Sequence, residues 1–294
     1  MEYISSKSSP STPIKAGVIG FPISHSLSPI IHNYYLKKLN ISGSYDKYLV
    51  PIDNFDESIK NLISNQKLAG FNVTIPHKER IFDLCHHISK TAQEIGAINT
   101  IKILSNGKIF GHNSDGEGFI KNLKNQISDF NFDNSKCLVI GAGGASRAII
   151  HALINQNVDD IYIANRTQSK IHKIINDFNL IALNKNTKLH SVELKKEYYF
   201  LDGIDLVINT SSMGMKNSEQ LQIKISNAKK TAIFYDIVYN PLYTDFLKNA
   251  RINNFRTITG IGMLIEQALV GFEMWFNHKP QYSLELEKIL LTNI

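Results

Sequence analysis

Two strand ends near the middle of the chain carry residue types that bind a dinucleotide. The apolar run 137–140 leads directly into a glycine-rich turn, and an apolar helical segment follows the turn. Glycines at such a junction allow a tight turn and let backbone N–H groups approach a pyrophosphate, which lies at the positive end of the next helix. The turn consists of Gly141, Ala142, Gly143, Gly144 and Ala145, with Ser146 where the usual pattern has Gly or Ala.

The next apolar run, 161–164, is followed by cations rather than acids. At this place an NAD site usually offers a carboxylate to the ribose 2′-hydroxyl, whereas an NADP site offers a cation to the 2′-phosphate. Arg166 stands at the strand end and Lys170 four residues later, while Asp159 and Asp160 precede the strand. The sequence therefore predicts NADP(H) as the cofactor.

A nicotinamide enzyme that oxidises an alcohol also needs a group that takes the hydroxyl proton as the hydride leaves. The segment 72–78 (NVTIPHK) ends a predicted strand, continues with a proline suited to the first turn of a helix, and ends in Lys78. Lysine acts as a base when burial lowers its pKa. A neighbouring carboxylate orients the lysine and raises its pKa. From this segment alone, an ordinary exposed lysine in a first helical turn is the better interpretation.

Two further segments offer polar groups with either a structural or a binding use. Asp115 lies in the turn 111–116 (GHNSDG) and begins a predicted helix, so it is either an N-cap or a carboxylate exposed at a domain junction. The loop 22–29 (PISHSLSP) follows the first predicted strand. Its hydroxyls at Ser26 and Ser28 suit a polyol or a carboxylate, and they equally suit the start of a helix.

The pattern of apolar residues divides the chain into two α/β regions, the first with an Asn-Gly hairpin signal at 105–107. The first region has predicted strands at 15–20, 45–50, 69–75, 97–104 and 108–113, and predicted helices at 28–40, 54–66 and in segments from Pro76 to Gly96. The second region begins with a helix near Asp115 and has predicted strands at 137–140, 161–164, 204–210, 232–239 and 255–259. Strands that alternate with helices predict a Rossmann-type doubly wound parallel sheet. The apolar helix 263–277 is expected to return to the first region.

Composition narrows the class of protein. The 294 residues are 43% hydrophobic and 20% charged, which suits two globular domains. The formal net charge of +6 is dispersed along the chain, so a nucleic-acid partner is not expected. The two cysteines exclude a disulfide framework, and no metal is predicted. The Ser- and Pro-rich start lacks the apolar stretch of a secretory signal, and no membrane span appears, so the expected location is cytoplasmic.

Taken together, these segments resemble the shikimate dehydrogenase family from Lys15 to the C-terminal helix. The resemblance is carried by the order and spacing of SHSLSP, NVTIPHK, GAINT, the Asn-Ser-Asp-Gly turn, GAGGASR, Asn165-Arg166-Thr167, Asn209-Thr210-Ser211-Ser212, YDIVYNP at 235–241 and GIGMLIEQ at 260–267. It implies an α/β protein that reversibly reduces 3-dehydroshikimate to shikimate with NADPH, in chorismate and aromatic amino-acid biosynthesis.

The resemblance also implies a role for particular residues. Lys78 is implied as the catalytic acid/base, paired with Asp115. The implied substrate-binding residues are Ser26, Ser28 and Tyr239 for the carboxylate, and Thr74, Asn99, Asp115 and Gln267 for the ring hydroxyls. The implied cofactor-binding residues are the turn 141–145, then Asn165, Arg166, Thr167 and Lys170 at the adenosine ribose, and Ile237 and Gly260 at the nicotinamide. Two residues differ from those frequent in the family: His77 stands where Phe is frequent, and Lys170 stands where Arg is frequent. Lysine offers a point charge, whereas arginine offers two parallel donors.

The expected domains are a disordered lead-in at 1–14, a substrate domain at 15–114 plus 260–294, and an NADP domain at 115–259. One alternative is a quinate/shikimate dehydrogenase with relaxed NAD(P) use, and another is a non-catalytic NADP-binding regulator. A methylenetetrahydrofolate dehydrogenase is more distant, because the glycine-loop pattern of that family is missing from this chain. Tyr34 and Lys38 precede the glycine loop, so their Tyr-x-x-x-Lys spacing is interpreted as coincidence. The adjacent His86 and His87 are likewise not interpreted as a metal site. A homodimer is one option for an oligomeric state that the sequence leaves open.

Overall fold

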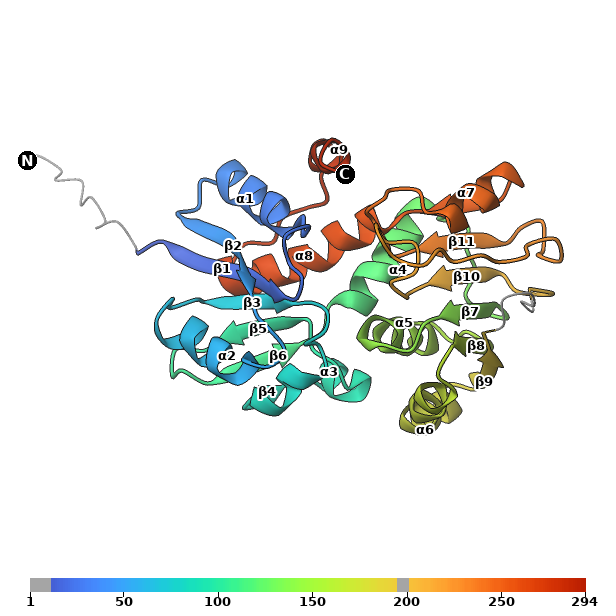
Figure 1. Cartoon of the computed structure of the whole chain (residues 1–294), viewed down its shortest axis with the longest axis horizontal. Coiled ribbons are helices and arrows are strands. Elements are labelled where there is room, and N and C mark those ends of the chain that lie inside the picture. The colour runs from blue at the N-terminus through green and yellow to red at the C-terminus, as the bar shows by residue number, and fades with distance from the viewer. Residues whose placement is uncertain (1–11, 195–200) are drawn as a thin grey trace, which may run out of the picture.

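The computed structural model describes residues 12–194 and 201–294, so most of the predicted lead-in lies outside the described residues. Two six-stranded sheets lie next to each other, and helices α4 (Asp115–Gln126) and α8 (Gly260–Phe276) run between them (Figure 1). This arrangement confirms the predicted α/β architecture with two sheets.

The first sheet has the strand order β2-β1-β3-β5-β6-β4 and mixes parallel with antiparallel pairs. Strands β1, β2 and β3 are parallel, whereas β5 pairs antiparallel with β3 and with β6. The Asn-Gly hairpin between β5 and β6 is confirmed, with Gly107 at φ 77°. The elements are β1 (Ile14–Gly20), α1 (Ser28–Lys38), β2 (Gly43–Leu49), α2 (Phe55–Ser64), β3 (Gly70–Val73), β5 (Thr100–Ile103) and β6 (Ile109–His112).

The segment after β3 is less helical than the sequence predicts. It contains a short 3₁₀ helix, η1 (Arg80–Leu84), the two-residue strand β4 (His87–Ile88) and α3 (Lys90–Ile95). The backbone of this segment is drawn into the first sheet instead, because the amides of His86 and Ser89 donate to carbonyls of β6. Lys78 lies in a turn, where its carbonyl accepts a hydrogen bond from the Ile98 amide, and the prediction of a helical segment from Pro76 was wrong there.

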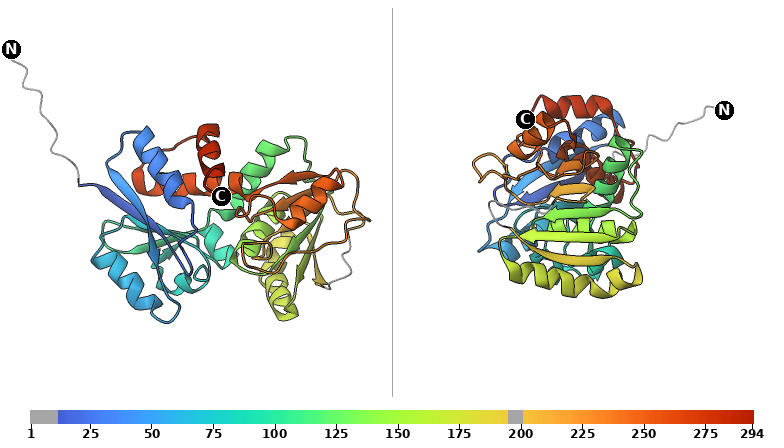
Figure 2. Two further views of the ribbon diagram at one scale, coloured as in Figure 1. Left: turned by 45° about the horizontal axis from the view of Figure 1, so that its top comes forward. Right: turned by 90° about the vertical axis from the view of Figure 1, so that its right-hand side faces the viewer.

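The second sheet is wholly parallel, with the strand order β12-β11-β10-β7-β8-β9 (Figure 2). Its strand order reverses between β7 and β10, which is the topological switch point where doubly wound sheets bind ligands. The prediction missed β9, an edge strand whose only apolar residues are Leu189 and Val192. The elements are β7 (Lys136–Ile140), α5 (Gly144–Asn155), β8 (Asp160–Asn165), α6 (Gln168–Asn184), β9 (Lys188–Glu193), β10 (Leu206–Asn209), β11 (Ile233–Asp236), α7 (Asp245–Ile252) and β12 (Arg256–Ile258).

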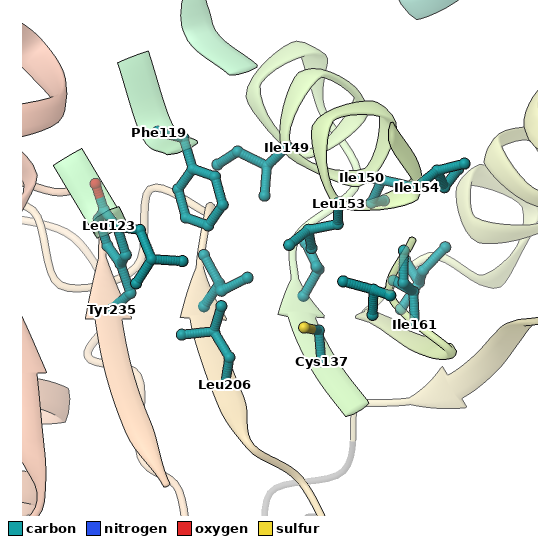
Figure 3. Close-up of a cluster of buried hydrophobic side chains, with 14 of the residues drawn as sticks. Phe119, Leu123, Cys137, Ile149, Ile150, Leu153, Ile154, Ile161, Leu206 and Tyr235 are labelled. Carbon is teal, nitrogen blue, oxygen red and sulfur yellow. The ribbon is translucent and has the colours of Figure 1, made fainter. Parts of the chain in front are cut away.

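Buried apolar side chains cover both faces of each sheet. Figure 3 shows one of these clusters, in which Phe119 of α4 and Ile150 of α5 lie over the second sheet. Cys137 of β7 belongs to this cluster, and burial raises the pKa of its thiol. It therefore packs as a small hydrophobic residue, as the sequence predicts.

Helix α8 returns to the first sheet, which confirms that prediction. Its residues Ile265 and Phe272 are buried in one cluster with residues of α1 and β1. The Trp275 indole donates a hydrogen bond of 2.7 Å to the Ile101 carbonyl of β5. A further helix that the sequence analysis did not include, α9 (Leu284–Leu291), lies against α1 and α8 (Figure 2).

A buried histidine in the first region makes the stability of the protein depend on pH. His32 is fully buried, stacks on Tyr45 with ring centroids 3.9 Å apart, and makes no hydrogen bond through its ring nitrogens to the described residues. Burial lowers the pKa of His32 to about 3. Since the unfolded chain protonates this histidine near pH 6.5, it binds more protons than the folded state between these values. The free energy of unfolding therefore falls as the pH drops below 6.5.

We expect the His32→Phe variant to lack this contribution, which is about 2 kcal/mol between pH 7 and pH 5. Urea unfolding at the two pH values measures the difference, and any packing cost of the larger ring cancels in the comparison. The exposed His172 of α6 provides the control, because His172→Gln should retain the wild-type pH dependence. An unchanged pH dependence in His32→Phe would contradict the assignment.

Candidate functional site

A lysine and an aspartate from different elements form a close ion pair between the two sheets. Lys78 lies in the turn after β3, and Asp115 is the first residue of α4. The Lys78 Nζ to Asp115 Oδ2 distance is 2.5 Å, and the side chains are only 16% and 2% exposed. The sequence left Asp115 as either an N-cap or an exposed carboxylate; the N-cap of α4 is Ser114, and the Asp115 carboxylate is buried in this pair.

Backbone and side-chain dipoles keep the Asp115 carboxylate in place. Its Oδ1 accepts a hydrogen bond of 2.7 Å from the Asn99 amide, and its backbone N–H donates to Asn113. Its position in the first turn of α4 adds the favourable field of the helix N-terminus, which stabilises a negative charge. These contacts therefore fix the Asp115 carboxylate in position beside the lysine.

Asn99 joins three segments that are distant in sequence. Its amide nitrogen also donates to Ser114 Oγ at 3.1 Å and to Gln267 Oε1 at 3.2 Å. Its side-chain oxygen Oδ1 accepts from the Ser114 backbone amide and from the Thr100 hydroxyl. Asn99, Asp115 and Gln267 thus share one hydrogen-bond network. Sequence reasoning missed Ser114 as a member of this network, although it stands in a motif that the resemblance uses.

Polar groups from the ends of β1 and β3 lie on the same edge of the first sheet. Ser26 Oγ accepts a hydrogen bond of 3.3 Å from the Ser28 amide, so the two serines belong to one turn. Thr74 follows β3, and its amide donates to Ile19 of β1 at 3.0 Å. Parallel strands end together, and the open edge beyond their carboxyl ends is where α/β sheets bind ligands.

Tyr239 links the second region to the serine loop. It follows β11 in sequence, yet it packs against the apolar cluster of the first sheet. Burial raises the pKa of its hydroxyl, and a hydrogen bond with the Leu27 backbone opposes that shift. A hydroxyl from the second region therefore lies beside the loop that contains Ser26 and Ser28.

The glycine-rich turn leaves the carboxyl end of β7 at the topological switch point. Gly141 has φ 122°, and a Cβ there would lie 2.6 Å from the Thr210 hydroxyl. Gly143 is exposed with open space beside it, and its amide donates to Ser146 Oγ in the first turn of α5. Ser146, which departs from the usual glycine pattern, thus stabilises the turn through this hydrogen bond. Its Oγ also lies 2.6 Å from the Thr210 hydroxyl.

These features fit a pyrophosphate, because an exposed backbone turn at a helix N-terminus is an anion-binding arrangement. Ala142, Gly144 and Ala145 are partly exposed in the same turn. A Cβ on Gly144 would lie 3.2 Å from Lys78 Cβ. The turn that is suited to the cofactor and the lysine that is suited to proton transfer are therefore direct neighbours.

The end of β8 carries the predicted cations at the surface. Asn165 donates from its side chain to the Thr167 carbonyl at 3.2 Å, which shapes the turn into α6. Arg166 and Lys170 are exposed, and Arg166 Nη1 lies 3.1 Å from Glu219 Oε2. Sequence reasoning missed Glu219, because no local pattern relates it to β8.

The ends of β11 and β12 meet around Ile237 and Gly260. Gly260 has no room for a Cβ, because the Ile237 carbonyl occupies that space. The buried Asp236 holds this region through hydrogen bonds from Thr244, Asn209 and the Val238 amide. Burial raises the pKa of Asp236 to about 6, although those three donors act in the opposite direction.

The Tyr34 and Lys38 pair and His86 make structural contacts. Lys38 donates to the Tyr34 hydroxyl at 2.9 Å on an exposed face of α1, far from the glycine turn in sequence and sheet. His86 Nδ1 accepts from the Ile109 amide at the edge of the first sheet. Within residues 12–194 and 201–294, no group of three His, Cys, Asp or Glu side chains is arranged for a metal ion. In the same residues, no helix is long and apolar enough to cross a membrane.

Models of known families match most of the chain. The matches are to the shikimate dehydrogenase substrate binding domain at residues 18–101, to shikimate / quinate 5-dehydrogenase at 122–241, and to the shikimate 5′-dehydrogenase C-terminal domain at 260–284. The NADP(+) shikimate dehydrogenase of Brucella abortus is 37% identical over 284 residues, which cover 95% of this chain and 94% of that protein.

Solved structures agree with these matches. The shikimate dehydrogenase of Aquifex aeolicus has a TM-score of 0.82 at 32% identity, with 94% of this chain and 97% of that chain covered. The enzyme of Thermus thermophilus, solved with NADP(H) and shikimate, has a TM-score of 0.82 at 28% identity, with 96% of this chain and 100% of that chain covered. The similarity therefore extends over both sheets and over the elements that join them.

Proposed function

Because the chain belongs to the shikimate dehydrogenase family, we propose that Lys78 is the group that exchanges a proton with the reacting oxygen of the substrate. The chain is an NADP-dependent oxidoreductase that acts on a CH–OH group, interconverting shikimate and 3-dehydroshikimate. NADPH, when bound, supplies the hydride for the reduction. The observation that carries the proposal is the buried pair of Lys78 and Asp115 beside the glycine turn.

In the reduction, the Lys78 ammonium donates a proton to the substrate oxygen, which gains negative charge as its carbon is reduced. In the oxidation, the neutral amine takes the hydroxyl proton. Asp115 does not exchange this proton; its charge stabilises the ammonium and its hydrogen bond fixes the direction of the amine. Asn99 keeps the second carboxylate oxygen occupied, so Asp115 cannot rotate away from Lys78 without breaking a buried hydrogen bond.

The remaining polar groups suit the other parts of a polyhydroxylated ring acid. Asn99 and Gln267 lie in the network around the ion pair, and Thr74 follows β3 at the edge of the first sheet; these three would bind ring hydroxyls. Ser26, Ser28 and Tyr239 supply hydroxyls and a backbone turn without an acidic group, which suits a carboxylate. We propose these two groups as the two ends of the substrate site.

The cofactor residues follow the second sheet from its switch point outward. The turn 141–145 would hold the pyrophosphate through backbone amides. Asn165, Arg166, Thr167 and Lys170 would hold the adenosine ribose and its 2′-phosphate, while Ile237 and Gly260 would border the nicotinamide. This division supports a substrate domain of residues 15–114 and 260–294 and an NADP domain of residues 115–259.

Absorbance of the reduced cofactor tests the function directly. We expect purified protein to form NADPH from NADP when shikimate is added, and to act far less well with quinate or with NAD. Well-folded protein that forms no NADPH from shikimate would contradict the assignment. Comparable turnover with quinate or with NAD would instead favour the quinate/shikimate alternative.

A further inference from the structure

We propose that Glu219 is a specificity-determining residue that weakens NADP binding by competing with the 2′-phosphate for Arg166. The proposal rests on the proposed function, which places the 2′-phosphate at Arg166. The Arg166 Nη1 to Glu219 Oε2 distance is 3.1 Å, with side chains 71% and 56% exposed. Arg166, the cation that suits the phosphate, is therefore already paired with a carboxylate of the protein.

The backbone places Glu219 opposite Arg166. The Gly214 amide donates to the Glu219 carbonyl at 2.8 Å, which closes a turn at residues 214–219. Gly214 has φ 91°, a conformation that glycine adopts readily and other residues rarely adopt. Leu221, two residues beyond Glu219, is only 2% exposed and anchors the chain in the core of the second region.

The start of the same loop is attached to the sheet. Asn209 at the end of β10 donates to the Met213 carbonyl and to the Asp236 carboxylate, each at 3.0 Å. Strands β8 and β10 both pair with β7, so Arg166 and this loop rise from the same edge of the sheet. The contact between Arg166 and Glu219 thus joins two segments that the fold holds on either side of the switch point.

Glu219 contacts Arg166 through Nη1, so a 2′-phosphate bound by the same guanidinium group would lie beside a carboxylate of like charge. When the 2′-phosphate binds, Arg166 either releases Glu219 or keeps it close to a group of like charge. Both outcomes subtract from the free energy that the phosphate gains. NAD carries a hydroxyl in place of the phosphate, so it leaves the pair intact and does not incur this cost.

Isothermal titration calorimetry with NADP, NAD and 2′,5′-ADP tests the proposal without turnover. We expect Glu219→Gln to bind NADP and 2′,5′-ADP about two- to five-fold more tightly, which is the range for an exposed ion pair, and to bind NAD unchanged. The gain should shrink at high salt, because exposed charges are screened. Glu57→Gln, an exposed glutamate of α2 in the first region, makes the same change in net charge and should alter no affinity.

The Arg166→Ala background shows whether Glu219 acts through Arg166. We expect the gain from Glu219→Gln to be smaller there, because the competition has been removed and only direct repulsion of the phosphate remains. Equal affinities of wild type and Glu219→Gln for 2′,5′-ADP would overturn the proposal, as would equal gains for NADP and NAD. Wild-type protein that does not prefer NADP to NAD would instead overturn the cofactor assignment on which the proposal rests.

Discussion

Replacing Lys78 with Met is expected to lower kcat for shikimate oxidation by about 10²-fold or more, which is the scale for loss of a general acid/base. Met has a similar length but no exchangeable proton, so the change removes the chemistry and retains much of the volume. KM for shikimate should change much less than kcat. A large rise in KM at unchanged kcat would make Lys78 a binding residue instead.

Loss of this lysine also leaves the buried Asp115 without its counterion. Breaking a buried ion pair on one side costs about 3–5 kcal/mol, so Lys78→Met is expected to lower the thermal midpoint as well. The double variant Lys78→Met with Asp115→Asn removes the uncompensated charge. It should recover part of the lost stability but none of the lost turnover.

That pair of variants separates catalysis from folding. If the double variant regained both stability and activity, the loss in Lys78→Met would be a folding effect and the acid/base role would be wrong. Lys60→Ala, at an exposed position of α2 in the same region, provides a matched control that should leave kcat and stability near wild type.

Replacing Arg166 with Ala is expected to raise KM and Kd for NADP by about 10- to 100-fold, because hydrogen bonds to charged groups contribute about 1.5–3 kcal/mol. KM and Kd for NAD should change little, since NAD has no 2′-phosphate. The ratio of kcat/KM for the two cofactors measures the effect. Equal losses for both cofactors would contradict the assignment of Arg166 to the phosphate.

The neighbouring helix offers a control for a general effect of charge. Lys173 is exposed on α6, seven residues after Arg166, and Lys173→Ala removes the same positive charge. It should leave the preference for NADP close to wild type. A loss comparable with that of Arg166→Ala would show that the net charge of the region, rather than one guanidinium, selects the cofactor.

Local sequence patterns were sufficient for the elements that are buried on both sides. β7 and β8 are continuous apolar runs next to turn signals, and such runs specify buried parallel strands. β9 was missed because it lies at an edge of the sheet and has only two apolar residues, Leu189 and Val192, which form no apolar run. The helix predicted after Pro76 failed because backbone groups of residues 86–89 pair with β6, a long-range interaction that outweighs local propensity.

Residue types alone predicted the dinucleotide turn and the cation after β8, because the requirement for glycine and for charge at these places is local. The role of Lys78 was different. From its own segment it suited an exposed helical lysine, and only the resemblance to a family paired it with Asp115. The structure supplied the contact itself, between two residues that are 37 positions apart.

The sequence by itself thus determined the class of fold, the glycine-rich turn after β7 and the cations after β8, since these depend on local periodicity, backbone freedom and residue charge. Tertiary structure decided which polar groups share a site. Asp115 is buried against Lys78 and Asn99, and Glu219 reaches Arg166 from another loop. Contacts of this kind arise where two sheets and their connections pack together, and no short stretch of sequence encodes that packing.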